Sequence, residues 1–479
     1  MKHKILYILL LLTINSKAQS YKIMETVEGD FQGLFSLYDY VKDDVYGYID
    51  FFLMDKIEPR LFKYKFNVLD KNLNKVISKE IEHPTLYNNS TLEVHSADYN
   101  NNYIFVIISE IYESKDILKY YFIYDILRDK IITKGIFHGE INYDGRYVNP
   151  KNKKFNPFDY ASPDINVLPL NKTGFLIIDK VKNPKMTKPK FLKTYTAVSF
   201  NGKYLWQKSA DLGLSYVYDN SKYIIFVKNN SPKDVLDVHY FHTRTGKELA
   251  IGHIRNKDEK YFYDYLYWKF DKKTGKITLI GKYKMKKHGA SLGIVKHELK
   301  PVGREIKSLD KKYLPYTGFG FDNINKKGKI KKEGSLVFSK MDIHPDGSIF
   351  IVAETVNAYT GIYKGLYTIL LDKDLNVLDK QHHITENSRS SKYAFSQKLI
   401  NNSGKAYIFY DKETRKNYKA HIIKLKYDNK NIDTFSLEIN LKRSSIYLMP
   451  ARAGYIMIYE VFKKPKKGEP QAELRFERI

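Results

Sequence analysis

Short runs of apolar, β-branched and aromatic residues recur along the chain, each bounded by Gly, Asn, Asp or Pro. Runs of this length and composition, separated by turn-forming residues, are typical of β-strands. The clearest occupy residues 103–108, 120–124, 174–178, 223–227, 261–270, 349–354, 406–410 and 455–459. Amphipathic windows of helical length are nearly absent, and the best of them, itself weak, spans residues 385–399. The pattern predicts an all-β protein.

One type of turn recurs between these runs. Segments 70–76, 125–131, 271–277 and 372–378 begin with Asp, and segment 242–248 is a looser copy. A type I turn with a G1 bulge needs a fifth residue that tolerates a positive φ, and the fifth residues here are Asn74, Asp129, Gly246, Gly275 and Asn376. Asn201-Gly202 is a separate two-residue hairpin signal. A calcium loop is the alternative for the Asp-led segments, but too few acidic ligands follow.

The spacing of these turns suggests a repeat. Asn74 and Asp129 are 55 residues apart, and so are Asn376 and Asn431 of the similar segment 427–431, whereas other intervals are 29 and 101. Four antiparallel strands in about 40–60 residues are the signature of a β-propeller blade. We therefore predict a β-propeller of seven or eight four-stranded antiparallel blades, formed as a single domain by residues 19–479.

The first 18 residues have the pattern of an export signal. Lys2 and Lys4 precede an apolar run at 5–14, and Ser16-Lys17-Ala18 fits the small-x-small cleavage rule. Ten apolar residues are too few to span a bilayer, which takes about 20. The later sequence has no run of about 18 apolar residues and no cysteine. We expect a signal peptide at 1–18 and an exported mature chain, periplasmic or extracellular, that does not span the membrane.

Two segments resemble a known group of proteins. Residues 341–355, which include His344-Pro345-Asp346-Gly347, are similar to the entry into the inner strand of divergent bacterial propellers, and residues 367–376 to the outer hairpin that follows. With the signal ending in Ala18-Gln19, the chain resembles uncharacterised exported propeller-like proteins of Bacteroidetes-type bacteria. It departs from the WD-repeat pattern because neither Trp precedes an Asp. The resemblance implies a fold and no activity.

The chain carries a formal charge of +27, from 81 Lys and Arg against 54 Asp and Glu. Only 12 of the cationic residues are Arg, which disfavours nucleic acid as a partner because phosphate recognition relies on the bidentate guanidinium. The densest lysine runs lie in polar stretches at 282–287, 326–332 and 463–467. They are either solvated loops and strand edges or a patch for acidic glycan, lipid head groups or an acidic envelope protein.

Several motifs suggest chemistry, but none is sufficient. Residues 289–293 match the G-x-S-x-G pattern around Ser291, although the expected strand before them and helix after them are missing. His239 and His242, and likewise His382 and His383, are spaced so that they point apart on a strand. Acidic candidates at strand ends are Glu110, Asp342, Asp346, Glu354 and Glu460. We assign no catalytic residue, no cofactor and no metal from the sequence.

Tyrosine is unusually abundant, with 41 residues. Strand-borne examples include Tyr121 and Tyr124, and alternation predicts that Tyr261, Tyr263, Tyr265 and Tyr267 share one face. They form either an aromatic core between blades or a platform for sugar rings or a partner. The sequence favours a non-enzymatic exported binding or scaffold protein whose face or channel engages a protein or glycan. The alternative is a carbohydrate-active hydrolase with acids converging on the channel.

Overall fold

The structure, a computed structural model, describes residues 20–24, 29–137 and 165–478 with short gaps. The gaps are residues 41, 43, 86, 114, 183–190, 212–213, 220–221, 231–234, 256, 259, 272–274, 303–304, 345, 357–362, 385–391, 399–403, 413–416, 427–430, 441–443 and 463–469. The expected signal segment 1–18, most of the 427–431 turn and the third lysine run therefore lie outside the described residues.

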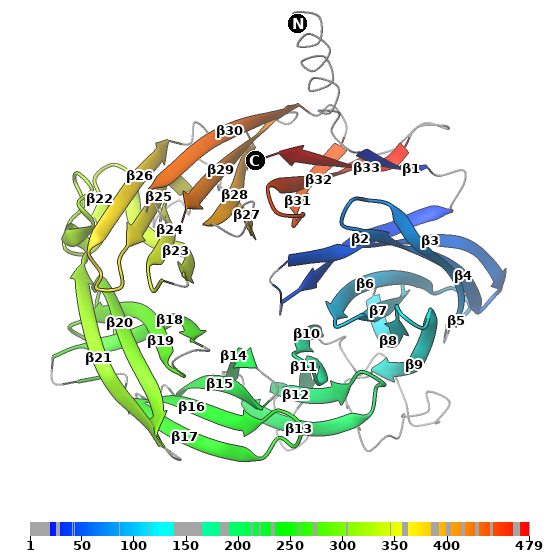
Figure 1. Ribbon diagram of the computed structural model, residues 1–479, viewed down its shortest axis with the longest axis horizontal. Coiled ribbons are helices and arrows are strands. Elements are labelled where there is room, and N and C mark those ends of the chain that lie inside the picture. Colours follow the sequence, from blue (N-terminus) through cyan, green and yellow to red (C-terminus); the bar gives the residue numbers. More distant parts are fainter. Residues whose placement is uncertain are drawn as a thin grey trace, which may run out of the picture.

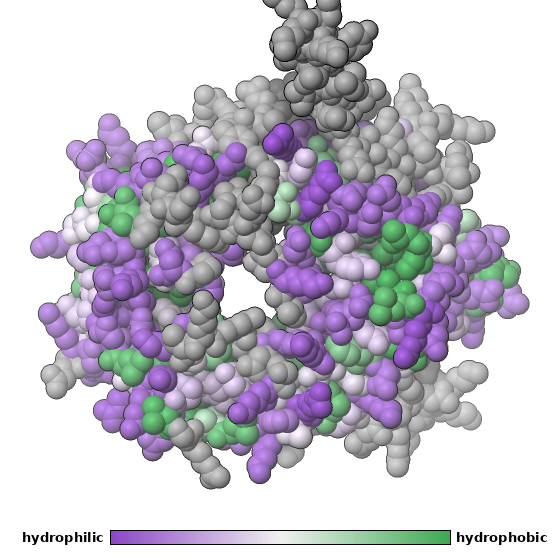
Figure 2. Space-filling view, viewed as in Figure 1, coloured by the Kyte–Doolittle hydropathy of each residue, from purple (hydrophilic) through white to green (hydrophobic). Residues whose placement is uncertain are grey.

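The described strands form eight antiparallel sheets arranged as blades around a ring (Figure 1), so the prediction of a β-propeller is confirmed. The space-filling view shows an opening at the centre of the ring (Figure 2). Blades 1 to 4 consist of β2 (Asp30–Asp39), β3 (Asp44–Glu58), β4 (Leu61–Asp70), β5 (Lys75–Pro84); β6 (Thr91–Asn100), β7 (Tyr103–Tyr112), β8 (Lys115–Asp125), β9 (Lys130–Phe137); β10 (Asn166–Leu170), β11 (Gly174–Lys182), β12 (Phe191–Ser199), β13 (Tyr204–Asp211); and β14 (Leu214–Asp219), β15 (Tyr223–Asn230), β16 (Val235–His242), β17 (Glu248–Arg255).

Blades 5 to 8 consist of β18 (Phe262–Phe270), β19 (Ile277–Lys284), β20 (Ser291–Val302), β21 (Glu305–Pro315); β22 (Lys329–Ile330), β23 (Gly334–Ile343), β24 (Ile349–Val356), β25 (Tyr363–Leu371), β26 (Val377–Ile384); β27 (Lys392–Lys398), β28 (Gly404–Lys412), β29 (Asn417–Lys426), β30 (Ile432–Asn440); and β31 (Ser444–Met449), β32 (Tyr455–Phe462), β33 (Pro470–Arg478), β1 (Ser20–Met24). A 3₁₀ turn, η3 (Tyr316–Phe319), precedes the extra short strand β22. No helix in the described part of the chain is long and apolar enough to cross a membrane.

The hydrophobic core lies between neighbouring blades. One cluster joins Val238 of blade 4 to Leu279 and Val295 of blade 5, and similar clusters join blades 1 to 2, 2 to 3, 3 to 4, 5 to 6, 6 to 7 and 8 to 1. Strands such as β7 and β24 are buried on both faces along most of their length. A strand covered on both faces has a continuous apolar sequence, and all eight predicted strand segments coincide with strands of the structure.

The recurring turns form as hairpins, with one correction to their geometry. Asp129, Gly246 and Gly275 adopt the predicted positive φ, but in the two Asp-Asn turns Leu73 (φ 66°) and Leu375 (φ 71°) adopt it one residue earlier than expected. Asp70 Oδ1 accepts hydrogen bonds from the backbone amides of residues 72 and 74, at 2.8 and 2.9 Å. This carboxylate anchors the turn, and the buried side chain of Leu73 stabilises a conformation that Leu rarely adopts.

Blade 5 explains the irregular spacing. In blades 1, 2, 4 and 6 the recurring turn joins the last two strands, whereas the turn at Gly275 joins β18 to β19, the first two strands of blade 5. That shift shortens one interval to 29 residues and lengthens the next to 101. Blade 8 has no such turn because its outermost strand is β1, from the other end of the chain.

Part of the weak helical window forms strand β27, at Lys392–Lys398, in agreement with the all-β prediction. One local prediction is wrong. The four alternating tyrosines do not share one face, because a β-bulge between Tyr265 and Tyr267 inserts an extra residue. Tyr263 and Tyr265 are buried between blades 4 and 5, whereas Tyr267 packs against the core between blades 5 and 6. These tyrosines therefore belong to the aromatic core between blades.

Candidate functional site

A pocket of about 590 Å³ lies between blades 5 and 6. Blade 5 contributes the end of β18, the start of β19 and the middle of β20 and β21, and blade 6 contributes its β23–β24 and β25–β26 turns. The charged lining residues are Lys269, Asp271, Lys276, Lys296, Glu298, Asp310, Lys312, Asp346, Lys373 and Asp374. Amines and carboxylates are thus equally represented on its walls, and the buried Phe270 adds an apolar surface.

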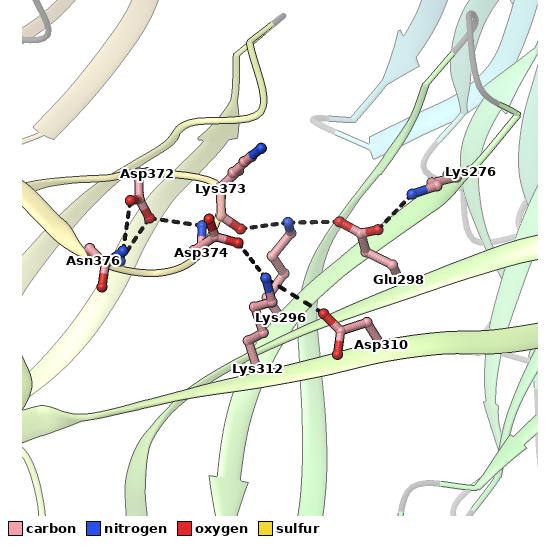
Figure 3. Close-up of polar contacts among 9 residues, drawn as sticks. All are labelled: Lys276, Lys296, Glu298, Asp310, Lys312, Asp372, Lys373, Asp374 and Asn376. Atoms are coloured by element: carbon pink, nitrogen blue, oxygen red, sulfur yellow. Dashed lines mark hydrogen bonds and ion pairs between the residues drawn. The ribbon is translucent and has the colours of Figure 1, made fainter.

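A chain of polar contacts crosses the pocket from one blade to the other (Figure 3). Lys296 donates to Glu298 Oε1 at 2.7 Å and to the backbone carbonyl of Lys373 at 2.8 Å, which ties β20 to the β25–β26 turn. Lys276 donates to the other oxygen of Glu298 at 3.0 Å. Lys312 on β21 pairs with Asp374 of the same turn. The Lys312 amine also lies 3.6 Å from Asp310 Oδ2.

Electrostatics keep the Glu298 carboxylate of the pocket ionised. Burial alone would raise the pKa of Glu298, but its hydrogen bonds and ion pairs with Lys296 and Lys276 outweigh burial and hold that pKa below its usual range. The Lys296 side chain is only 7% exposed, whereas that of Lys312 is 37% exposed. The pocket therefore contains fixed charges of both signs at short range, one pair buried and one accessible to solvent.

The two lysines that hold the β25–β26 turn should differ in their effect on stability. We expect Lys296→Met to lower the free energy of unfolding by about 2–3 kcal/mol, because it removes two sheltered hydrogen bonds of a charged group. Lys312→Met should cost less than about 1 kcal/mol, since exposed ion pairs contribute little. Urea denaturation of both variants measures the difference. Equal effects would contradict the claim that the buried lysine holds the blades together.

A second polar cluster lies beside the pocket and joins three blades. Asp342, at the end of β23, accepts hydrogen bonds from Lys405 at 3.0 Å, Tyr407 at 3.2 Å and Tyr267 at 3.3 Å. His344 bonds the Tyr407 hydroxyl at 2.7 Å and Ser348 at 3.2 Å. Lys405 and Tyr407 come from β28 of blade 7, and Tyr267 from β18 of blade 5.

The charge state of this cluster suits cohesion better than proton transfer. Burial opposes ionisation of Asp342, but Lys405 and Lys269 outweigh burial and lower the pKa of the carboxyl. Burial lowers the pKa of His344 to about 4, so the ring is neutral at pH 7. An ionised Asp and a neutral His, with hydrogen bonds to their neighbours, stabilise the junction of the three blades.

Of the other predicted acids, one lines this pocket and three lie apart from it. Asp346 lines it but bonds Ser348 at 2.6 Å, as a turn residue does. Glu354 lies near the opposite end of β24 and accepts from Ser339 at 2.6 Å. Glu110 in blade 2 bonds Tyr120 at 2.5 Å, and Glu460 in blade 8 pairs with Arg475 at 3.2 Å. The structure therefore brings only Asp342 and Asp346 of these five to one end of one blade.

The serine and histidine motifs also have structural roles. Ser291 begins β20 after the hairpin that follows β19, so a strand and not a helix comes after it. Its hydroxyl accepts a hydrogen bond from Tyr316 at 3.1 Å. His239 bonds Glu248 and His242 bonds Thr245, both at 3.2 Å. His382 stacks on Tyr367, with 4.3 Å between the ring centroids. Among the described residues, no group of three or more metal-ligating side chains is arranged to hold a metal ion.

Sequence reasoning missed Lys296, Glu298, Asp310 and Lys312. Lys296 and Glu298 are two residues apart on β20 and therefore point to the same face of the sheet. The signal was available, because these charges interrupt a strand that is otherwise buried from Gly293 to Leu299. A charge inside a buried strand requires a partner. Glu298 is a local partner of Lys296, but the carbonyl of Lys373 lies 77 residues later, in the next blade, and no local pattern identifies it.

Part of the chain matches a family without an assigned function. Residues 372–479, from the β25–β26 turn to the C-terminus, match the model described as "Family of unknown function (DUF6770)". No curated protein sequence matches the chain significantly.

Solved structures resemble the chain at low sequence identity. The WD40 domain of SCAP from fission yeast is 10% identical over 96% of this chain and 98% of that one, with a TM-score of 0.41. The polysaccharide lyase Uly1 is 9% identical over 96% and 100%, with a TM-score of 0.45. A member of the DUF4221 family from Bacteroides vulgatus is 11% identical over 66% and 93%, with a TM-score of 0.28. At such identities the likeness concerns the fold alone.

Proposed function

We propose that the chain is an exported, non-enzymatic binding protein whose pocket between blades 5 and 6 accepts a sugar unit of a glycan. The observation that supports this is the alternation of amines and carboxylates contributed by two blades to one pocket. A sugar hydroxyl both donates and accepts hydrogen bonds, lysine only donates, and an ionised carboxylate only accepts. A lining with both kinds of group therefore suits a polyhydroxylated ligand better than a ligand of one charge.

The protonation states favour binding over glycoside hydrolysis. A hydrolase needs one carboxyl group whose pKa is raised, so that it can protonate the leaving oxygen. In the pocket the pKa of Glu298 is lowered, and so is that of the neighbouring Asp342. Two ionised carboxylates held by lysines are acceptors of hydrogen bonds. Export rests on the signal pattern of residues 1–18.

Lys373 offers the sharpest test, because it lines the pocket and holds Lys296 through its backbone carbonyl and not through its side chain (Figure 3). Calorimetry with a panel of neutral and acidic oligosaccharides should identify a ligand that Lys373→Ala binds about tenfold more weakly, the effect of one lost hydrogen bond to a charged group. The protein is the mature chain secreted by its host, with Gln19 expected as its first residue on N-terminal sequencing.

Lys71→Ala is the matched control. Lys71 occupies the same place in the β4–β5 turn of blade 1, is exposed like Lys373, and follows an Asp with the same hydrogen bonds. We expect the affinity of the Lys71→Ala variant for the oligosaccharide to equal that of the unmodified protein. Cleavage of any bound oligosaccharide would overturn the non-enzymatic proposal, equal losses in both variants would exclude this pocket, and a first residue at Met1 would contradict export.

A further inference from the structure

Two of the lysine runs meet on blades 5 and 6, at the opposite ends of their strands from the pocket. Strand β19 starts at the pocket, where Thr278 lines the wall, and ends about 25 Å away at Lys284. The β19–β20 hairpin that follows carries one run, and the segment between η3 and β23 carries the other. We call the exposed lysines of these two segments, together with Lys284, the lysine face: Lys284, Lys286, Lys287, Lys326, Lys327, Lys329, Lys331 and Lys332.

The buried side chain of Tyr316 joins the two segments. Its hydroxyl donates to Ser291 at 3.1 Å, at the base of the first segment. Its ring packs so closely on Gly328 of the second segment that a Cβ there would lie 2.7 Å from a ring carbon. Lys282 contributes to the same contact, because its amine lies 5.2 Å from the Phe338 ring, which in turn lies 6.2 Å from the Tyr316 ring. Segments 40 residues apart are thereby held side by side.

The second segment has a fixed backbone. Asn325 Oδ1 accepts from the backbone amides of Lys327 at 2.9 Å and Lys329 at 3.0 Å, and Gly328 adopts a φ of 70° that closes the turn. Ile330 is buried in the core between blades 5 and 6. The lysines on either side are exposed, so their ammonium groups are displayed from an ordered support, and binding costs less conformational entropy than it would from a free loop.

The charge of the lysine face is strongly one-sided. Residues 284–292 and 322–333 contain eight lysines and no arginine, against two acidic residues, Asp322 and Glu333. Glu333 is directed elsewhere, to hydrogen bonds with Tyr367 at 2.6 Å and Thr355 at 3.0 Å. Lys284 pairs with Asp264. A concentration of like charges on one surface attracts a polyanion at the cost of repulsion in the free protein.

We propose that the lysine face binds a linear anionic polysaccharide, independently of the pocket on the opposite side. Lysine is a compact charge on a flexible stem, which suits the carboxylate or sulfate groups repeated along such a chain, whereas nucleic-acid recognition favours the planar guanidinium. An anionic membrane would also be attracted, but Met285 is the one exposed large hydrophobic side chain within the two segments. Anchoring to lipid takes a larger apolar contribution than one side chain supplies.

The test replaces four lysines of this face, chosen from both segments, in Lys286→Glu/Lys327→Glu/Lys329→Glu/Lys331→Glu. Binding to immobilised polygalacturonate and to dextran sulfate is measured from 50 to 500 mM NaCl. For the unmodified protein we expect affinity to fall linearly on a logarithmic salt scale, as counterion release requires. For the variant we expect binding at least about tenfold weaker at the lowest salt, with a shallower salt dependence.

A variant with the same change of net charge elsewhere is the control. Lys71, Lys130, Lys203 and Lys247 are exposed in or beside the outer turns of blades 1 to 4. Changing these four to Glu should leave polysaccharide binding within about twofold, because screened surface charges beyond about 10 Å contribute little. Equal losses in the two variants would reduce the effect to net charge and overturn the proposal.

Other outcomes distinguish the sources of the effect. Binding to vesicles of anionic lipid or to duplex DNA, without binding to either polysaccharide, would also overturn the proposal. Circular dichroism of both variants shows whether the fold is retained. Because the pocket residues are unchanged in both, any oligosaccharide found for the pocket should still bind. The proposal for the lysine face and the proposal for the pocket can therefore be overturned independently of each other.

Discussion

Acidification from pH 6.5 to pH 4 is expected to remove most of the stability of this protein. Burial lowers the pKa of four histidines: to about 4 for His83, His344 and His383, and to about 3 for His297. An unfolded histidine has a pKa of about 6.5, so in this pH range the unfolded chain binds more protons and stability falls as pH falls. Each histidine contributes up to about 3 kcal/mol, against a typical total of about 5–15.

The environments of these rings show why protonation is unfavourable. His297 is fully buried, with its two nitrogens 2.6 Å from the Tyr265 hydroxyl and 2.7 Å from Ser308 Oγ. The nearby charge of Lys311 adds to the effect of burial. Asp342 acts in a different range: because its pKa is lowered, its contribution to stability is lost only below the ordinary Asp pKa of about 3.9. Loss above pH 4.5 therefore belongs to the histidines, and it is partly offset by Asp98, because burial raises the pKa of that carboxyl to about 7 and the folded chain takes up its proton in this range.

Urea denaturation at half-unit steps from pH 7 to pH 4 measures this dependence. We expect a maximal slope of several kcal/mol per pH unit, since each titrating histidine adds up to about 1.4. His297→Gln should reduce that slope by about one quarter while keeping a hydrogen-bonding side chain. His288→Gln, at an exposed hairpin tip, is the control and should leave the slope unchanged. A stability that stays constant from pH 6.5 to 4.5 would refute the prediction.

The fold could be predicted because its determinants are local. Strands such as β7 and β24 are covered on both faces, and their sequences are accordingly apolar without alternation. The turns between them are set by Asp side chains that bond amides two and four residues later, as Asp372 does at 2.8 Å each. Both signals are contained in fewer than ten residues. Strand order and blade architecture follow from them.

The site could not be predicted in the same way, because it is a product of contacts between blades. Lys296 is recognisable as an unusual buried charge, but its carbonyl partner belongs to Lys373, in the next blade. Similarly, the bulge at Tyr265 depends on how β18 pairs with β19, and it transfers Tyr267 to a different interface. The same limit applies to the lysine face, where Tyr316 links two runs that are separate in the sequence.

The number of blades depends on the longest-range pairing of all. Strand β1 pairs with β33 in an antiparallel register from Ser20 with Arg475 to Met24 with Pro470, so the two ends of the chain share blade 8. The interface is continued by Gln471, whose Oε1 accepts from the amide of Phe31 at 3.0 Å. Tyr48 donates to the carbonyl of Pro450 at 2.8 Å. Backbone pairing thus joins the two chain ends within blade 8, and side-chain hydrogen bonds and an apolar cluster hold blade 8 against blade 1.

Removing strand β1 should open this closure. For a chain that begins at Gly29 we expect a free energy of unfolding lower by about 3–5 kcal/mol, from several lost backbone hydrogen bonds at about 1 kcal/mol each. The loss also uncovers the edge of β33, where Ala472 and Leu474 are now buried.

A chain that begins at Ser20 is the matched control and should unfold at the same urea concentration as one that begins at Gln19. A synthetic peptide of residues 19–29 should restore stability to the truncated chain by adding the missing strand. An unchanged urea midpoint after truncation would mean that the ring closes without β1.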